Sequence, residues 1–289
     1  MNQQLLYEIA GHCMLIITPD AEITAGLIPT FRPFRVDSEG VSNILFRFFG
    51  NTKISIPVDT PDDVMEVDGF TFCVYHNEGS VTVCIKIKDI EHCFNISKNR
   101  EIVTSDLTLT QRYESHFLAY FLRAAFGMVS ANHRTIKLHA SVIEKEGKAL
   151  VFMGKSGTGK STHSRLWKEF VPGCTLLNDD EPIVRVLNEG AVRVYGAPWS
   201  GSTPCYRNAF AEVSAFVRLY QSPENKLTRL NGINAFASVF QSAAILRSDK
   251  ENRELTISTV NDILEQVDVY RLDNRPDREA VSLTESLMV

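Results

Sequence analysis

The chain has 289 residues, of which 44% are hydrophobic, with 30 Lys and Arg against 35 Asp and Glu and a formal net charge of −5. A chain of this length forms one large domain or two smaller ones. The mild acidity excludes a nucleic-acid-binding protein that depends on an excess of basic side chains. The longest apolar-rich stretch, 117–129, is too short for a membrane span of ~20 residues, and the first residues lack the basic region of a signal peptide. We therefore expect no nucleic-acid partner and no membrane role.

Residues 1–110 predict a β-rich subdomain. Apolar residues alternate with a period of two in 70–76 and 81–88, with a hairpin loop at 77–80 between them. We expect an antiparallel sheet here and find no chemical motif. The first 133 residues carry 10 Lys and Arg against 16 Asp and Glu, and the remainder carries 20 against 19. Solvated acidic loops explain this asymmetry, and docking of a basic partner is the alternative.

The six cysteines show no CxxC pair and no spacing with histidine that suggests zinc. Cys73 and Cys84 lie in strand-like segments, where a free cysteine usually acts as a small hydrophobic residue. Together with the missing signal peptide, this usage favours the reducing environment of the cytoplasm.

The pattern changes to a helical period from about residue 111, where aromatic residues recur at steps of three and four. We interpret 111–133 as a helix that connects the β-rich part to a second domain, 134–289. In that domain, strand, glycine-rich turn, helix and strand follow one another, which is typical of an α/β fold. The expected strands are 136–144, 148–153, 174–178, 182–187, 191–195, 213–220 and 267–272, and the expected helices are 160–170, 232–247 and 256–266.

The strongest motif is Gly154-Lys-Ser-Gly-Thr-Gly-Lys-Ser161, which matches G-x-x-x-x-G-K-[ST] in full. It follows an apolar strand and precedes an amphipathic helix, which is the context of a phosphate-binding loop. Its glycines allow the backbone to present successive N–H groups to phosphate oxygens. The residues expected to bind the nucleotide are Gly154, Ser156, Gly157, Thr158, Gly159, Lys160, Ser161 and Thr162.

Two residues of this motif carry specific chemistry. Lys160 supplies a positive charge to the outer phosphates, and the Ser161 hydroxyl suits a Mg²⁺ ligand. ATP or GTP is thus the expected ligand. A glycine-rich turn that binds nothing is the alternative.

Acidic residues end the next predicted strand, in Leu176-Leu-Asn-Asp-Asp-Glu181. A carboxylate in this place holds Mg²⁺ or activates a nucleophile in phosphate-loop proteins, although an acidic strand-to-turn cap would look the same. His139 lies on the predicted strand before the phosphate-loop strand, where a lone histidine is usually structural.

Several segments together resemble one family. LHASV with its histidine, the hairpin after it, GKSGTGKST and LLNDDE are similar to the catalytic domain of HPr kinase/phosphorylase and of the related ATP-dependent phosphoenolpyruvate carboxykinases. The segment GAPWSG at 196–201 resembles the Pro-Trp-Ser-Gly segment of that wider group, and 269–277 resembles the end of uncharacterised members found in peptide-modification gene cassettes. The resemblance covers about 134–280 and does not reach the β-rich part.

The resemblance implies roles for individual residues. Asp179 would orient or deprotonate the acceptor hydroxyl, with His139 beside it to tune its charge, while Ser161 and Asp180 would hold Mg²⁺. It also favours a homo-oligomer. Two departures restrict it: the Arg-Gly-Leu-Gly-like signature tied to reverse phosphorolysis is absent, and the arginine and metal-binding set of the carboxykinases cannot be placed.

The sequence therefore predicts a cytoplasmic enzyme of α/β fold, with a phosphate-loop domain of HPr kinase/phosphoenolpyruvate carboxykinase type. We expect a kinase that uses ATP and Mg²⁺ to phosphorylate a Ser/Thr hydroxyl of a peptide, a protein or a small molecule. The alternatives are a nucleotide-binding switch or docking module with little catalysis, and a carboxykinase-like enzyme acting on a small keto acid.

Overall fold

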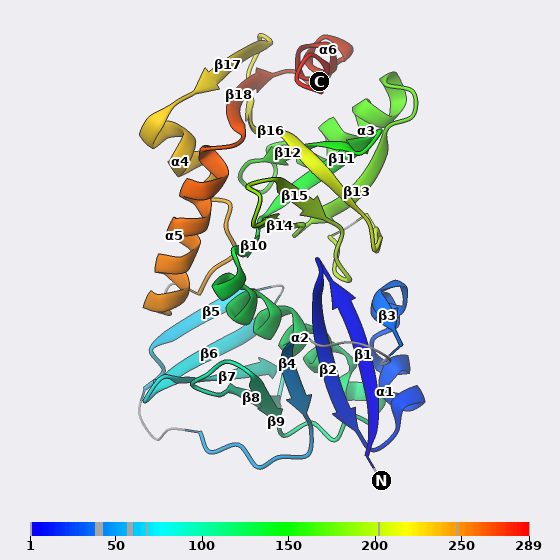
Figure 1. Ribbon diagram of the computed structural model, residues 1–289, viewed down its shortest axis with the longest axis vertical. Helices are drawn as coiled ribbons and strands as arrows, with labels where there is room; N and C mark the ends of the chain where they lie inside the picture. The colour runs from blue at the N-terminus through cyan, green and yellow to red at the C-terminus, as the bar shows by residue number, and fades with distance from the viewer. Residues whose placement is uncertain are drawn as a thin grey trace. The chain divides into compact units, whose positions relative to one another are not determined.

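The computed structural model describes residues 2–37, 43–56, 60–67, 69–201, 203–246 and 248–288. They form two compact units, Met1–Ser130 with Leu246–Glu251, and Ala131–Ile245 with Asn252–Val289. Each unit is built on its own sheet (Figure 1).

The sheet of the first unit has the order β3-β1-β2-β4-β9-β8-β7-β6-β5. Its strands are β1 (Gln3–Ile9), β2 (His12–Thr18), β3 (Arg35–Val36), β4 (Ile44–Phe49), β5 (Asp63–Val67), β6 (Phe70–Asn77), β7 (Ser80–Ile87), β8 (Ile90–Ile96) and β9 (Ile102–Ser105). The hairpin expected at 77–80 is confirmed, because Asn77 of β6 pairs with Ser80 of β7.

The expectation that this sheet is antiparallel is wrong at its centre. β4 pairs in parallel with both β2 and β9, so the sheet is mixed. Parallel neighbours need a crossover of a dozen or more residues. Helix α1 (Ala21–Leu27) and the 3-10 helix Pro29–Phe34 provide it between β2 and β4. Alternation of apolar residues shows which face of a strand is buried but not the direction of its neighbour.

Helix α2 (Ser115–Ser130) belongs to the first unit and ends where the second unit begins. The Phe121 ring lies 4.7 Å from the Phe94 ring of β8, and both side chains are buried. The apolar stripe of the helix therefore forms the core against the first sheet.

The expectation that Cys84 is a free thiol is also wrong, because Cys84 and Cys93 form a disulfide bond between β7 and β8. They stand opposite each other in the strand register, with Cα atoms 4.1 Å apart. Such proximity depends on the register, which the spacing of cysteines along the chain does not show. The free cysteines are Cys13, Cys73, Cys174 and Cys205. The disulfide removes cysteine usage as support for a reducing compartment.

The second sheet has the order β10-β14-β15-β16-β12-β11-β13, with β18 paired to β16 and β17 paired to β18. Its strands are β10 (Thr135–Lys137), β11 (Ala140–Lys145), β12 (Lys148–Met153), β13 (Thr175–Asp180), β14 (Ile183–Val186), β15 (Val192–Tyr195), β16 (Phe210–Gln221), β17 (Lys226–Leu230) and β18 (Asp268–Asn274). The helices of this half of the chain are α3 (Lys160–Phe170), α4 (Gly232–Phe240), α5 (Lys250–Leu264) and α6 (Arg278–Glu285).

Helices cover both faces of this sheet. Val151 of β12 belongs to a buried cluster with residues of α4 and α5, whereas its neighbour Phe152 belongs to a cluster with residues of α3 and α6. Figure 1 shows the two pairs of helices on different sides of the sheet. Because β12 is buried on both faces, its sequence is a continuous apolar run. The mixed α/β architecture predicted for this half is thus present.

The expected strand 136–144 is divided into β10 and β11 at His139. The backbone N–H of His139 donates to the Ser242 carbonyl at 2.6 Å, outside the strand ladder. His139 therefore does not lie on a strand, and its side chain is free of the strict alternation of a strand. Local sequence did not show this break because the partner, Ser242, lies far along the chain.

Two further helix boundaries differ from the expectation. The helix expected at 232–247 ends at Phe240, and the one expected at 256–266 begins at Lys250. β17 and α6 were not predicted. The start of α6 does carry a recognisable signal, since the Asp277 side chain accepts a hydrogen bond from the Ala280 N–H as an N-cap.

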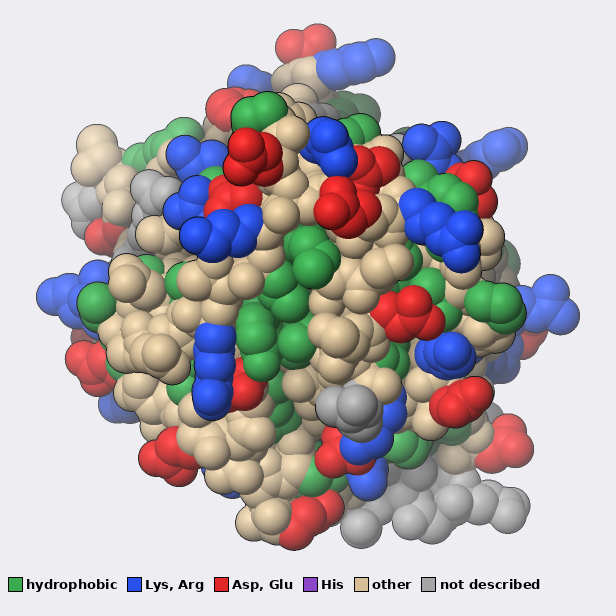
Figure 2. Space-filling model, turned by 90° about the horizontal axis from the view of Figure 1, so that it is seen from above, with side chains coloured by type: hydrophobic (Ala, Val, Ile, Leu, Met, Phe, Trp, Pro, Cys, Tyr) green, Lys and Arg blue, Asp and Glu red, His purple; other side chains and the backbone are tan. Residues whose placement is uncertain are grey.

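Among the described residues, no helix has both the length and the apolar character of a membrane span. On the face shown in Figure 2, basic and acidic side chains alternate around a short apolar band. No large patch of a single charge sign is visible on this face, in keeping with the near balance of charges after residue 133.

Candidate functional site

Three segments of the second sheet meet at one edge. β11 pairs antiparallel with both β12 and β13, so β12 and β13 run in the same direction. The register places Ala140 opposite Met153 on one side and opposite Asp180 on the other. The loop after Met153, the residue before Ala140 and the acidic end of β13 are therefore brought together.

The loop between β12 and α3 has the backbone that its glycines allow. Gly157 and Gly159 have φ angles of 80° and 98°, and Gly159 is the residue immediately before α3. A side chain at Gly154 would collide with the Thr158 hydroxyl, which donates to the Lys155 carbonyl at 2.8 Å. The first N–H groups of α3 have no partner within the helix and attract anions.

Lys160 points back into this loop. Its Nζ donates to the carbonyl oxygens of Gly154 at 3.1 Å and Lys155 at 3.4 Å, and lies 2.9 Å from His139 Nε2. The side chain is only 9% exposed, and within the described part of the chain it forms no ion pair.

The charge of Lys160 is therefore poorly compensated. Burial lowers the pKa of its ammonium group, the charges of Asp179 and Asp180 act in the opposite direction, and Arg218 lowers it further. An anion bound in the loop would favour the charged form of Lys160.

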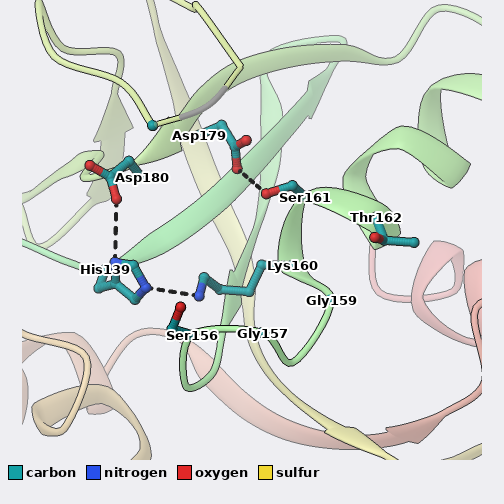
Figure 3. Close-up of a pocket in the computed structure, with 10 residues that line it drawn as sticks. His139, Ser156, Gly157, Gly159, Lys160, Ser161, Thr162, Asp179 and Asp180 are labelled. Atoms are coloured by element: carbon teal, nitrogen blue, oxygen red, sulfur yellow. Dashed lines mark hydrogen bonds and ion pairs between the residues drawn. The ribbon is translucent and has the colours of Figure 1, made fainter. Parts of the chain in front are cut away.

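The two ring nitrogens of His139 have different neighbours. Lys160 Nζ can only donate, so His139 Nε2 accepts from it at 2.9 Å. His139 Nδ1 lies 3.4 Å from Asp180 Oδ1, within ion-pair distance of that carboxylate (Figure 3). His139 thus lies between the lysine of the loop and the acidic end of β13.

The two adjacent aspartates have different partners. Ser161 Oγ donates to Asp179 Oδ1 at 3.0 Å, while Asp180 faces His139 (Figure 3). The resemblance had implied the opposite pairs, with His139 beside Asp179 and Ser161 beside Asp180. The physical reason is that successive side chains of an extended strand point to opposite sides, so Asp179 is directed toward α3 and Asp180 toward the break before β11.

The backbone at this position is fixed by a neighbouring loop. The Asp179 carbonyl accepts hydrogen bonds from the Gly201 N–H at 2.7 Å and from the Ser200 hydroxyl at 3.1 Å. Asp180 has a φ of 141°, which a residue with a side chain rarely adopts. A Cβ at Gly201 would lie 3.3 Å from the Asp180 Cβ, a tight contact, so the loop approaches this position closely.

These side chains surround a cavity of about 360 Å³. Its lining residues are His139, Ser156, Gly157, Gly159, Lys160, Ser161, Thr162, Asp179, Asp180 and Gly201. Of the residues that the sequence singled out, Gly154 and Thr158 are not in the lining and instead shape the loop. Gly201 was not predicted as a site residue, although it ends the GAPWSG segment that carried part of the resemblance.

The donor set of the cavity fits a nucleotide phosphate with Mg²⁺. Mg²⁺ prefers hydroxyl and carboxylate oxygens, which Ser161, Asp179 and Asp180 provide. The buried Lys160 ammonium and the N-terminus of α3 provide positive charge for phosphate oxygens.

Comparisons with known proteins add little to this geometry. No protein-family model matches the chain, and neither does any curated protein. Among solved structures, the chain has a distant likeness to the HPr(Ser) kinase/phosphatase from Coxiella burnetii. The identity is 13%, the match covers 52% of this chain and 87% of that chain, and the TM-score is 0.32. A TM-score of this size does not establish a common fold.

Proposed function

We propose that the chain is an ATP- and Mg²⁺-dependent kinase that transfers a phosphoryl group to the hydroxyl of an acceptor. The observation that carries this proposal is that the buried Lys160 and two carboxylates line one cavity at the start of α3. When bound, Mg²⁺-ATP would supply the transferable phosphoryl group and the neutralisation of its charge.

Residues of the chain bind the phosphates, hold the metal and accept the proton. Lys160 binds the outer phosphate oxygens, and releasing its present carbonyl contacts frees its N–H groups for them. Ser161 and Asp180 are the oxygen ligands assigned to the metal. Asp179 lines this cavity and also a second, adjoining cavity, and we assign it as the group that receives the proton of an acceptor hydroxyl.

The test compares the two adjacent aspartates in the full chain. Labelled ATP, Mg²⁺ and candidate acceptors should give ADP only when an acceptor is present. Asp179→Asn should lower transfer by about 10²–10⁴-fold, the usual contribution of a general base, and keep nucleotide affinity. Asp180→Asn should instead raise the Mg²⁺ concentration needed for half-maximal rate, and excess Mg²⁺ should restore part of the activity.

Other outcomes would contradict this assignment. ADP formation that is independent of every acceptor would count against a kinase. Full output in Asp179→Asn and Asp180→Asn, together with complete loss in Lys160→Ala, would instead identify a nucleotide-binding switch, because only nucleotide binding would then matter.

A further inference from the structure

A second cavity, of about 400 Å³, adjoins the 360 Å³ cavity around Lys160, called the phosphate cavity below. Ser161, Thr162 and Asp179 line both cavities. Figure 3 shows Thr162 on the side of Ser161 that lies away from His139. The second cavity therefore begins where the hydrogen-bonded pair of Ser161 and Asp179 ends the first.

The outer wall of this second cavity is basic. Arg165 and Lys168 line it from α3, three residues apart and thus on neighbouring turns of one helix face. Both side chains are exposed, and neither forms an ion pair with any residue that the structure describes. Asp179 is the carboxylate among the lining residues, and it accepts from Ser161. The wall thus has two cations and one carboxylate.

We propose that this cavity binds the acceptor, and that the acceptor carries an anionic group, a carboxylate or a phosphate, in addition to its reactive hydroxyl. This proposal rests on the kinase function proposed above. The hydroxyl lies at Asp179 and the anionic group at Arg165 and Lys168. Arginine and lysine in this position form charge-assisted hydrogen bonds to such groups, and arginine can form two at once.

The helix geometry gives the size of the acceptor. Ser161 marks the hydroxyl end, and Arg165 and Lys168 follow it by four and seven residues. At a rise of ~1.5 Å per residue, the backbone positions of Arg165 and Lys168 lie roughly 6 and 10 Å along the helix from that of Ser161. An acceptor that spans the cavity therefore carries its anionic group several bonds from its hydroxyl. This spacing matches a seryl residue with an acidic neighbour or a sugar phosphate.

The transfer balances without a further reactant. The acceptor oxygen forms a bond to the γ-phosphorus of ATP while the bond from that phosphorus to the β,γ-bridging oxygen breaks. The hydroxyl proton passes to Asp179 and then to solvent, and ADP leaves with the bond's electron pair.

Matched probes test the anionic group. One pair is N-acetyl-Ser-Glu-amide and N-acetyl-Ser-Gln-amide, and the other is ribose 5-phosphate and ribose. Binding is measured by NMR titration of the full chain saturated with Mg²⁺ and a non-hydrolysable ATP analogue. We expect the charged member of at least one pair to shift resonances of Thr203 and Leu176, which line the cavity, and the neutral member to bind at least about tenfold more weakly.

The variants make the test specific. Arg165→Gln with Lys168→Gln should weaken binding of the charged probe by about tenfold or more and leave nucleotide affinity unchanged. The matched control is Lys250→Gln with Arg253→Gln, two exposed cations at the same spacing on α5, and it should leave binding of the probe unchanged. The pair that responds identifies whether the charge belongs to a peptide or to a sugar phosphate.

Each outcome separates this inference from the proposed function. Equal binding of charged and neutral probes, an unchanged affinity in the α3 double variant, or no shift with any charged probe overturns the inference. If the charged probe binds as expected but labelled ATP gives no phosphorylated probe, the proposed function fails while the binding site stands. If transfer occurs equally to both members of a pair, the kinase stands and the anionic site does not.

Discussion

Asp180 combines an unfavourable backbone with a side chain that lines the cavity at the start of α3. Its φ of 141° lies where an L-residue is strained, at a cost of about 1–3 kcal/mol. The surrounding contacts of Gly201 and the Asp179 carbonyl maintain this conformation. Strain of this kind is found at sites where the position of a side chain matters more than stability.

This strain predicts that the usual order of stability of glycine and alanine variants is reversed at position 180. Asp180→Ala keeps the Cβ and the strain, whereas Asp180→Gly removes both, and the two variants lose the carboxylate equally. Asp180→Gly should therefore be more stable than Asp180→Ala by about 1 kcal/mol, although glycine is usually the less stable of the two by 0.5–1 kcal/mol. Urea unfolding followed by tryptophan fluorescence measures the difference. Alanine at least as stable as glycine would show that the backbone there is relaxed.

His163 should make the stability of the second unit depend on pH. It is 1% exposed, and its ring packs edge-on against Phe152 with centroids 4.6 Å apart. Burial lowers the pKa of His163 to about 4 from an ordinary value of 6.5. The unfolded chain thus binds a proton between these pH values that the folded chain does not. Stability from this residue is complete above pH 6.5 and is lost as the pH falls toward 4, by about 3 kcal/mol at 1.36 kcal/mol per pKa unit.

The measurement is urea unfolding at pH 7 and pH 4.5, followed by tryptophan fluorescence. His163→Gln removes the titrating ring and can retain a hydrogen bond to Thr284, which His163 Nε2 approaches at 3.3 Å. This variant should lose less stability on acidification than the natural chain. An equal loss in both chains would assign the acid sensitivity to other groups.

Residue types at the site were predictable from sequence, but their partners were not. The loop motif and the acidic pair after β13 are local, and the structure brings them together with His139. The pairing of Ser161 with Asp179, and of His139 with Asp180, depends on which side each aspartate faces at the end of an extended strand. That direction comes from the register with β11, a long-range property.

At the scale of elements, β11 is what assembles the site. It lies between β12 and β13 and makes their carboxyl ends neighbours. β12 and α3 begin and end at the predicted residues, 148–153 and 160–170, because a continuous apolar run and a glycine-rich loop are strong local signals. β17 and α6 were missed because each is short, with five and eight residues. The direction of β4 was missed because the strand pattern contains no information on it.

The disulfide between β7 and β8 should stabilise the first unit. Closing a loop of this size in the unfolded chain contributes about 2–3 kcal/mol, for a sequence separation of 9 residues. A reducing agent should therefore lower the urea midpoint of far-UV circular dichroism. The denatured, unreduced chain should show four free thiols, those of Cys13, Cys73, Cys174 and Cys205.

Two cysteine variants serve as controls for the effect of the reducing agent. Cys84→Ala with Cys93→Ala should be insensitive to reducing agent, and Cys73→Ser, at the register position beside Cys84, should remain as sensitive as the natural chain. Six titratable thiols without reductant would show that the bond does not form.

At the scale of the whole molecule, the division into units does not follow chain order. The segment Leu246–Glu251 comes from the second half of the chain but belongs to the first unit. Arg100, 6% exposed, donates to the Asp249 carboxylate at 3.2 Å, to Glu251 at 2.8 Å and to the Met128 carbonyl at 3.0 Å. A buried guanidinium thus joins this segment to the first unit. The composition split near residue 133 could not show the insertion, because six residues change neither charge balance nor periodicity.

Substitutions around Arg100 should affect the stability of the first unit more than that of the second. Asp249→Ala leaves Arg100 buried with less compensation, and removal of one partner from a buried ion pair costs about 3–5 kcal/mol. Glu251→Ala is the control, because the Glu251 side chain is 66% exposed and an exposed pair contributes only about 0–1 kcal/mol. The two tryptophans, Trp167 and Trp199, both lie in the second unit. Asp249→Ala should therefore shift the unfolding transition seen by far-UV circular dichroism more than the one seen by fluorescence, and equal losses in the two variants would contradict this role for the Arg100 cluster.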